Sequence, residues 1–173
     1  MKVKKKWALA EVMPVAERLY KEFAPHCEQI AVVGSVRRQE PLVSDIDLII
    51  IPKRPFFWGV VLKNGIAEAV DKYTKVVGDM TEKSKYVRRK TPEGIEVDLW
   101  ICNERNWGLA INIKTGPVNY NVSTILRGLE TQGYAMFENH VIRKSTGDVI
   151  PVRNETDLYK LINIPYKKPE DRR

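Results

Sequence analysis

The apolar segment "DIDLIII" begins with two aspartates, Asp45 and Asp47, that are one residue apart. Its pattern is typical of a buried β-strand, on which side chains two residues apart point to the same face. The two carboxylates therefore project together, and without a counter-charge they would repel each other and resist desolvation. A divalent cation would remove this conflict, because carboxylate oxygens are the ligands that Mg²⁺ prefers. Alone, the Asp-x-Asp pattern is weak, and an exposed strand end with two solvated aspartates explains it more simply.

Three neighbouring features favour the metal interpretation. Gly34 and Ser35 follow a predicted strand and open a helical turn, a geometry that offers backbone N–H groups and a hydroxyl to a phosphate. Arg38, or Arg37 beside it, lies on that turn and can donate two parallel hydrogen bonds to phosphate oxygens. A third acid, Asp98, lies on another predicted strand within "EVDLW".

Three carboxylates on two adjacent strands, beside an anion site, match the needs of two-metal phosphoryl transfer. One ion would lower the pKa of an attacking hydroxyl, and the other would hold a triphosphate and stabilise the leaving oxygen. Asp45 and Asp47 would bridge both ions, and Asp98 would complete the site of the first ion.

The hydrophobic pattern predicts the elements that must position these residues. Predicted helical segments are residues 6–23, 35–40, 58–73, 106–116, 117–133 and 154–164. Predicted strands are residues 28–34, 45–51, 74–80, 85–91 and 95–102, with a hairpin turn at "TPEG" and a small hairpin region at 134–152. The prediction is a mixed sheet with helices up to about residue 103, followed by a smaller α+β part. Four tryptophans are expected in the core or between the two parts: Trp7, Trp58, Trp100 and Trp107.

The charge of the chain suits a polyanionic partner. The net charge is +7 over 173 residues, with +4 in residues 1–102 and +3 in residues 103–173. Nucleic acid is the first candidate for such a partner, although an unspecialised basic surface explains the charge equally well. No apolar run approaches the roughly 18–20 residues of a membrane helix, so no membrane association is expected. The amphipathic N-terminal segment indicates a protein that is not exported.

Three segments together resemble a known family. "GSVRRQEPLVSDIDL" resembles the signature of the nucleotidyltransferase superfamily, and within it the family X (polymerase beta-like) DNA polymerases. "TGPVNYN" resembles the segment that this family places at the incoming nucleotide, and "LYKLINIPYKKPEDRR" is similar to its C-terminal tail. The resemblance implies an α+β fold, in which residues 1–103 form a nucleotidyltransferase palm, a mixed β-sheet with helices on one side. Residues 104–173 would form a small α+β subdomain that binds the nucleotide and the nascent base pair.

The resemblance also implies roles for individual residues. Catalysis and the binding of two Mg²⁺ ions, for which Mn²⁺ can substitute, would fall to Asp45, Asp47 and Asp98. Residues that bind the nucleotide would be Gly34, Ser35, Arg38, Ser44, Thr115, Gly116 and Asn121. The first four would hold the β- and γ-phosphates, the next two would line the sugar, and Asn121 would reach the minor-groove edge of the base. A lysine among Lys4, Lys5 and Lys6 would be a further triphosphate ligand.

Some positions depart from the family pattern. Ile113 and Lys114 replace the usual aromatic pair before Thr-Gly, which puts discrimination against ribonucleotides in question. Glu96 replaces an arginine that often contacts the primer strand. Arg88 or Lys85 would take over this contact with DNA. Arg127 is also a predicted DNA contact, because it lies two residues after Ile125, where the family often has a minor-groove arginine. The basic strand around Arg88 is equally well explained as a solvated face.

The leading hypothesis is a DNA-directed DNA polymerase that adds nucleotides from dNTPs to a primer 3′-hydroxyl during repair. Its partner would be a primer–template or gapped duplex, bound weakly and in a salt-sensitive way by a monomer. Two alternatives stay open. Ile113 leaves room for a template-independent, RNA or small-molecule nucleotidyltransferase. An inactive nucleic-acid-binding module is less consistent with the presence of all three acids and Arg38.

Overall fold

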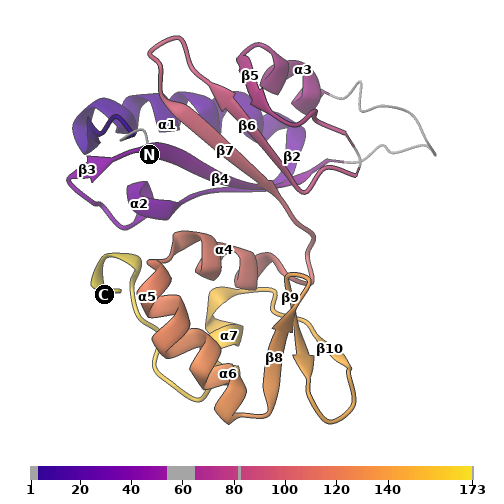
Figure 1. Cartoon of the computed structure of the whole chain (residues 1–173). Helices are drawn as coiled ribbons and strands as arrows, with labels where there is room; N and C mark the ends of the chain where they lie inside the picture. Colours follow the sequence, from indigo (N-terminus) through magenta and orange to yellow (C-terminus); the bar gives the residue numbers. More distant parts are fainter. Residues whose placement is uncertain (1–3, 54–64, 82, 173) are drawn as a thin grey trace. The chain divides into compact units, whose positions relative to one another are not determined.

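The computed structural model describes residues 4–53, 65–81 and 83–172, and the chain divides into two compact units (Figure 1). The units are Met1–Ile101 and Cys102–Arg173, and each has a buried apolar cluster of its own. The boundary between the units, after Ile101, lies two residues before the predicted boundary at residue 103. Among the described residues, no helix combines the length and apolar character needed to cross a membrane.

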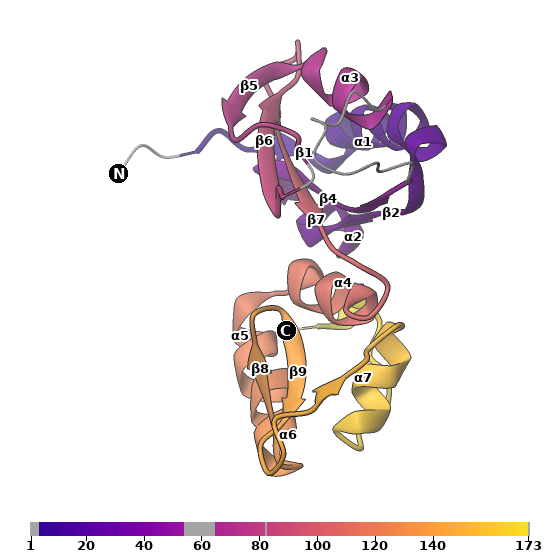
Figure 2. The ribbon, with the colours of Figure 1, turned by 90° about the vertical axis from the view of Figure 1, so that its right-hand side faces the viewer.

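The first unit is built on a five-stranded mixed sheet with strand order β2-β4-β7-β6-β5 (Figures 1 and 2). In that order the strands are Cys27–Val33, Asp45–Pro52, Glu96–Ile101, Tyr86–Lys90 and Thr74–Val77. The central pair of β4 and β7 is parallel, and the other neighbouring pairs are antiparallel. At the predicted "TPEG" turn, the Gly94 N–H donates to the Thr91 carbonyl at 2.9 Å and joins β6 to β7 as a hairpin. The predicted mixed sheet is confirmed.

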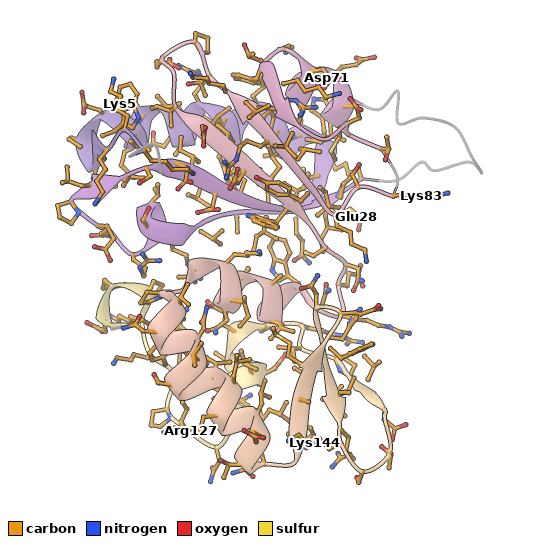
Figure 3. All side chains as sticks on the ribbon, in the orientation of Figure 1. Lys5, Glu28, Asp71, Lys83, Arg127 and Lys144 are labelled. Carbon is orange, nitrogen blue, oxygen red and sulfur yellow. The ribbon has the colours of Figure 1, made fainter. Side chains whose placement is uncertain are left out.

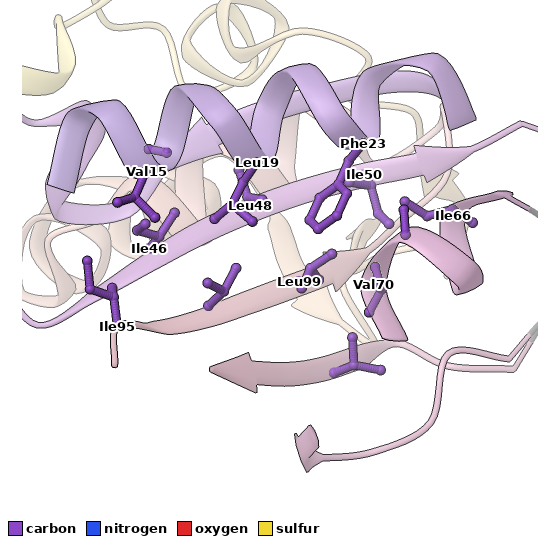
Figure 4. Packing of buried hydrophobic residues seen from close by; sticks show 14 of the residues in the cluster. Val15, Leu19, Phe23, Ile46, Leu48, Ile50, Ile66, Val70, Ile95 and Leu99 are labelled. Atoms are coloured by element: carbon purple, nitrogen blue, oxygen red, sulfur yellow. The ribbon is translucent and has the colours of Figure 1, made fainter. Parts of the chain in front are cut away.

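Two helices, α1 (Leu9–Phe23) and α3 (Gly65–Asp71), pack on one face of this sheet (Figures 2 and 4). Leu19 of α1 and Leu48 of β4 are both fully buried in this cluster. Burying a side chain of this size contributes roughly 1.5–3 kcal/mol relative to leaving it exposed. Because strand residues alternate between faces, β4 directs Ile46, Leu48 and Ile50 into the core and its two aspartates to the opposite face. The core therefore fixes the orientation of the acids.

The first helix begins at Leu9, later than the predicted start at residue 6. Trp7 and Ala8 instead form the short strand β1 (Trp7–Ala8), which pairs antiparallel with β3 (Leu42–Val43). The Ala8 N–H donates to Glu11 Oε2 at 2.9 Å, which satisfies a backbone donor at the start of the helix. The short segments η1 (Ala24–His26) and α2 (Gly34–Arg37) precede and follow β2.

Part of the predicted helix at residues 58–73 lies outside the described residues. The described part is α3, which ends at Asp71, two residues before the predicted end. Trp58 also lies outside the described residues, so its expected place in the core stays a prediction.

The second unit combines helices with a three-stranded antiparallel sheet of order β10-β9-β8. Its helices are α4 (Trp107–Thr115), α5 (Val118–Tyr120), η2 (Asn121–Leu126), α6 (Arg127–Thr131), α7 (Glu155–Leu161) and η3 (Pro169–Asp171). Its strands are β8 (Tyr134–Phe137), β9 (His140–Arg143) and β10 (Val149–Ile150). The predicted helix at 117–133 contains π-helical turns at η2, a geometry that is rare and is often found at functional sites. As predicted, Asn154 caps the last long helix, and its N–H donates to Asp157 Oδ2 at 2.9 Å.

Gly108 in α4 packs directly against the backbone at the start of α7. A Cβ atom added to Gly108 would lie 2.2 Å from the carbonyl carbon of Asn154 and 2.6 Å from its nitrogen. A Cβ added to Gly128 in α6 would instead lie 3.0 Å from Ile162 Cβ, a contact that a shift of a few tenths of an ångström relieves. We expect Gly108→Ala to lower the free energy of unfolding by about 3 kcal/mol, because α4 and α7 must separate.

The matched control is Gly128→Ala, which should stay within about 1 kcal/mol of the wild type because alanine favours the helix. Urea unfolding of the full chain, followed by far-ultraviolet circular dichroism, measures both values. Equal losses in the two variants would show that the contact of Gly108 with Asn154 does not limit stability.

Candidate active site

The predicted acids of the first unit lie on one face of its two central strands. In the parallel pairing of β4 with β7, Asp47 is the cross-strand neighbour of Asp98, and Asp45 is the neighbour of Glu96. Asp98 is buried, with 5% of its surface exposed, whereas Asp45 and Asp47 are half-buried. The strand register thus brings four carboxylates, including the three predicted metal ligands, to one surface.

Gly34 leaves the space that the Asp47 carboxylate needs. Gly34 follows the end of β2, where Val33 pairs with Asp47, and its φ of +66° lies in the left-handed region that favours glycine. A Cβ atom at this position would lie 2.2 Å from Asp47 Oδ2. The backbone that opens the predicted phosphate-binding turn therefore packs against an acid of the predicted triad.

The other predicted phosphate ligands of the first unit lie on short connecting segments. Ser35 is half-buried in α2, and Ser44 is half-buried between β3 and β4, directly before Asp45. Arg38 follows α2, and its Nε donates to Glu40 Oε1 at 3.3 Å. Arg38 retains 15% exposure of its side chain, so a phosphate could still reach it.

Arg88 binds Asp98 through two hydrogen bonds. Its Nε donates to Oδ1 at 2.5 Å, and its Nη2 donates to Oδ2 at 2.7 Å. The Tyr86 hydroxyl donates to the same Oδ1 at 2.9 Å. The hydrogen bonds with Asp98 raise the pKa of the Arg88 guanidinium. The pKa of Tyr86 is also raised, mainly by burial and secondly by its hydrogen bond to Asp98. Arg88, which the sequence analysis assigned to DNA, is thus a partner of the site's most buried acid.

Lys4 bridges two further acids of the same face. Its Nζ lies 2.8 Å from Asp45 Oδ2 and 3.2 Å from Glu96 Oε2. The hydrogen bond to Asp45 is the main cause that raises the pKa of Lys4. Of the other two lysines considered as triphosphate ligands, Lys5 lies over the Trp7 ring at 3.4 Å from its centroid, and Lys6 is exposed.

Trp100 and Tyr86 are site residues that the sequence analysis did not identify. The Trp100 Nε1–H donates to Asp47 Oδ1 at 3.2 Å, and the Trp100 ring packs on Tyr86 with 4.3 Å between centroids. A usable signal was present, because Trp100 is two residues after Asp98 on one strand and must share its face. The pairing of Tyr86 with Trp100 across β6 and β7 depends on register, which the sequence pattern did not specify.

The carboxylates of the predicted triad fit a hard divalent cation, although two of them form ion pairs with basic side chains in this structure. Within the described residues, no three His, Cys, Asp or Glu side chains are gathered so that they could hold a metal ion. Two predicted ligands, Asp45 and Asp98, instead bind Lys4 and Arg88. The ligand atoms are all carboxylate oxygens, and the four acids outnumber the two bases, so the face remains negative.

The predicted nucleotide-binding residues of the second unit lie where α4 ends and the next helix begins. Thr115 is fully buried at the end of α4, and Gly116 has a φ of +67° before the cis bond to Pro117. Asn121 is 7% exposed, and its Nδ2 donates to the Ile113 carbonyl at 2.8 Å. Its Oδ1 accepts no hydrogen bond from any of the described residues. This oxygen is itself buried, so a ligand could use it only after the surrounding groups moved.

The remaining predicted DNA contacts are exposed. Lys85 directly precedes β6 in the first unit. Arg127 begins α6 in the second unit (Figure 3). Their exposure allows a contact with a phosphate backbone.

Comparisons with known proteins agree on one family. Residues 110–173 match the family model described as DNA polymerase beta thumb. The Repair DNA polymerase X proteins of African swine fever virus isolate Pig/Kenya/KEN-50/1950 and of the Vero-adapted strain Badajoz 1971 are each 26% identical over 145 residues. The matched region covers 84% of this chain and 82% of each viral protein.

Two crystal structures of Leishmania infantum polymerase beta have a similar fold. The ternary P/T complex matches with a TM-score of 0.76 at 19% identity, over 99% of this chain and 78% of that one. The ternary gap complex matches with a TM-score of 0.75 at 18% identity, over 97% and 71%. The fold is therefore the mixed α+β fold of polymerase beta. These matches agree with the sequence resemblance to family X, the polymerase beta-like DNA polymerases.

We expect Gly34→Ala to destabilise the first unit and displace the Asp47 carboxylate. The control is Gly94→Ala, because Gly94 has a φ of +91° but its Cβ would meet no atom closer than 3.8 Å. Backbone strain should cost each variant about 1–2 kcal/mol, and the clash with Asp47 should add about 1–3 kcal/mol for Gly34→Ala alone. Urea unfolding of both variants measures the difference, and equal losses would contradict the packing argument.

Proposed function

We propose that the protein is a DNA-directed DNA polymerase that extends primer ends or fills gaps during DNA repair. The observation that carries this proposal is the surface on β4 and β7 where Asp45, Asp47 and Asp98 lie together beside Gly34. The relatives named Repair DNA polymerase X, which match over most of both chains, support the same activity.

In the proposed reaction, the primer 3′-hydroxyl releases its proton to solvent and its oxygen bonds to the α-phosphorus of a dNTP. The bond between the α-phosphorus and its bridging oxygen breaks, and pyrophosphate leaves. Asp45, Asp47 and Asp98 would hold two Mg²⁺ ions. Such ions lower the pKa of the attacking hydroxyl and neutralise charge on the leaving oxygen. The side chains of Ser35 and Arg38 and the backbone of Gly34 and Ser44 would orient the triphosphate so that the leaving group lies opposite the attacking oxygen.

The second unit would select and position the nucleotide. The family model for the polymerase beta thumb supports this role, because it covers residues 110–173. Thr115 and Gly116 would line the sugar, where Gly116 presents backbone without a Cβ atom. Asn121 would reach the minor-groove edge of the base, where every base presents an acceptor. Its Nδ2 carries a second N–H besides the one that donates to Ile113, and this N–H would donate to that acceptor.

The DNA substrate would be a primer–template or gapped duplex. The solved relatives, which are ternary P/T and gap complexes, support this kind of partner. Lys85 and Arg127 are exposed and would contact backbone phosphates. Binding that depends on few such contacts weakens as salt concentration rises.

The metal assignment predicts that Asp98→Asn lowers primer extension with Mg²⁺ by about 100-fold or more, because a charged metal ligand is lost. The control is Asp79→Asn, which removes an exposed carboxylate that pairs with Lys75 outside the site. Single-turnover extension of a gapped duplex measures the rate, and circular dichroism checks the fold. Full extension by folded Asp98→Asn would rule out the assignment of Asp98 as a metal ligand.

If the substrate is a primer–template, primer extension with the dNTP that complements the template should be faster on a gapped duplex than on a single strand. The same assay with rNTPs measures the sugar preference that Ile113 and Lys114 put in question. Comparable extension of single strands by any nucleotide would favour a template-independent nucleotidyltransferase. DNA binding with no incorporation under any condition would favour a binding module.

A further inference from the structure

Five charged side chains of the first unit form a continuous row of ion pairs on the sheet face that carries the predicted acids. In order they are Asp45, Lys4, Glu96, Arg88 and Asp98, with alternating sign. The central acid, Glu96, accepts from both bases through one oxygen, with Oε2 at 3.2 Å from Lys4 Nζ and 3.0 Å from Arg88 Nη1. Each base therefore binds one predicted metal ligand and shares Glu96.

The backbone register fixes this order. Glu96 lies opposite Asp45 on the neighbouring strand, and Arg88 lies opposite Asp98. Within this row of ion pairs, the end at Asp98 is the more buried, with side-chain exposure of 7% for Asp98 and 22% for Arg88. At the other end the exposure is 22% for Asp45 and 49% for Lys4.

A metal ion and these bases compete for the same oxygen atoms. Arg88 donates to both carboxylate oxygens of Asp98, and Lys4 donates to Oδ2 of Asp45. Metal ligation by those atoms requires each base to give up its contact, at least in part. Glu96 is outside the predicted triad, so its contacts with both bases can persist after that exchange.

We propose that Lys4 and Arg88 are built-in counter-ions of the metal site and that Glu96 is the positioning residue that retains them when metal ions bind. The bases neutralise the clustered carboxylates in the metal-free protein, which lets the strands pair. Glu96 then lowers the cost of exchange, because a displaced base remains paired with an acid and does not become isolated. The inference builds on the metal assignment made under the proposed function.

The first test measures Mn²⁺ binding to the full chain, without DNA or nucleotide, by the loss of the free-ion signal in electron paramagnetic resonance. Loss of a competing base should tighten binding, by about 10-fold for Arg88→Gln and about 3-fold for the more exposed Lys4→Gln. The control, Lys75→Gln, breaks the exposed pair with Asp79 and should leave the affinity unchanged. If Arg88→Gln does not fold, Lys4→Gln provides the same test at the exposed end.

A double-mutant cycle separates the role of Glu96 from a simple charge effect. Glu96→Gln should weaken Mn²⁺ binding by about 5-fold in the wild type, and by less than about 2-fold when Lys4→Gln and Arg88→Gln are both present. An equal loss in both backgrounds would show that Glu96 acts directly on the ion and would overturn its positioning role. Unchanged or weaker binding in both Lys4→Gln and folded Arg88→Gln would overturn the counter-ion role.

The binding measurement also distinguishes this inference from the proposed function. Tighter Mn²⁺ binding in the base variants, together with no primer extension by the wild type, would support the counter-ion inference and reject the polymerase. Normal primer extension by the wild type, with no change in Mn²⁺ affinity in the base variants, would support the polymerase and overturn the counter-ion inference.

Discussion

The parallel pairing of β4 with β7 is the constraint on which the candidate site depends. This register places Asp47 beside Asp98 and Asp45 beside Glu96. The opposite face of the same strands carries Leu48 and other fully buried side chains of the core. Apolar burial favours the pairing, and the pairing brings like charges together. The free energy of the core therefore holds the carboxylates in an arrangement that they would not adopt alone.

The protein compensates these charges unequally along the face. The exposed contact of Lys4 with Asp45 is of the kind that contributes at most about 1 kcal/mol. The pair of Arg88 with Asp98 is less exposed and has two charge-assisted hydrogen bonds, so it contributes more to stability. Donors without charge complete the set, because Trp100 donates to Asp47 and Tyr86 donates to Asp98. The site is thus most strongly organised around Asp98.

The two units divide the proposed chemistry. All acids of the predicted triad belong to the first unit, whereas the second unit carries the match to the polymerase beta thumb. Each unit has its own core, so each can hold its residues rigidly. In the second unit, the π-helical turns begin at Asn121, whose amide donates a hydrogen bond to the Ile113 carbonyl near the end of α4. Catalysis and nucleotide selection would then rest on separately stabilised elements.

The sequence by itself determined the features that depend on neighbouring residues. Alternation along β4 predicts one face for Asp45 and Asp47, and Pro and Gly in "TPEG" predict the hairpin turn. The resemblance to the family also depends only on short motifs, which can be read from neighbouring residues. Only the tertiary structure decided which basic side chain pairs with which acid and that Trp100 donates to Asp47. It also decided that Trp7 and Ala8 form a strand paired with β3 instead of the start of the first helix. These contacts depend on the register between distant segments, and that register comes from the packing of the whole core, which no local pattern encodes.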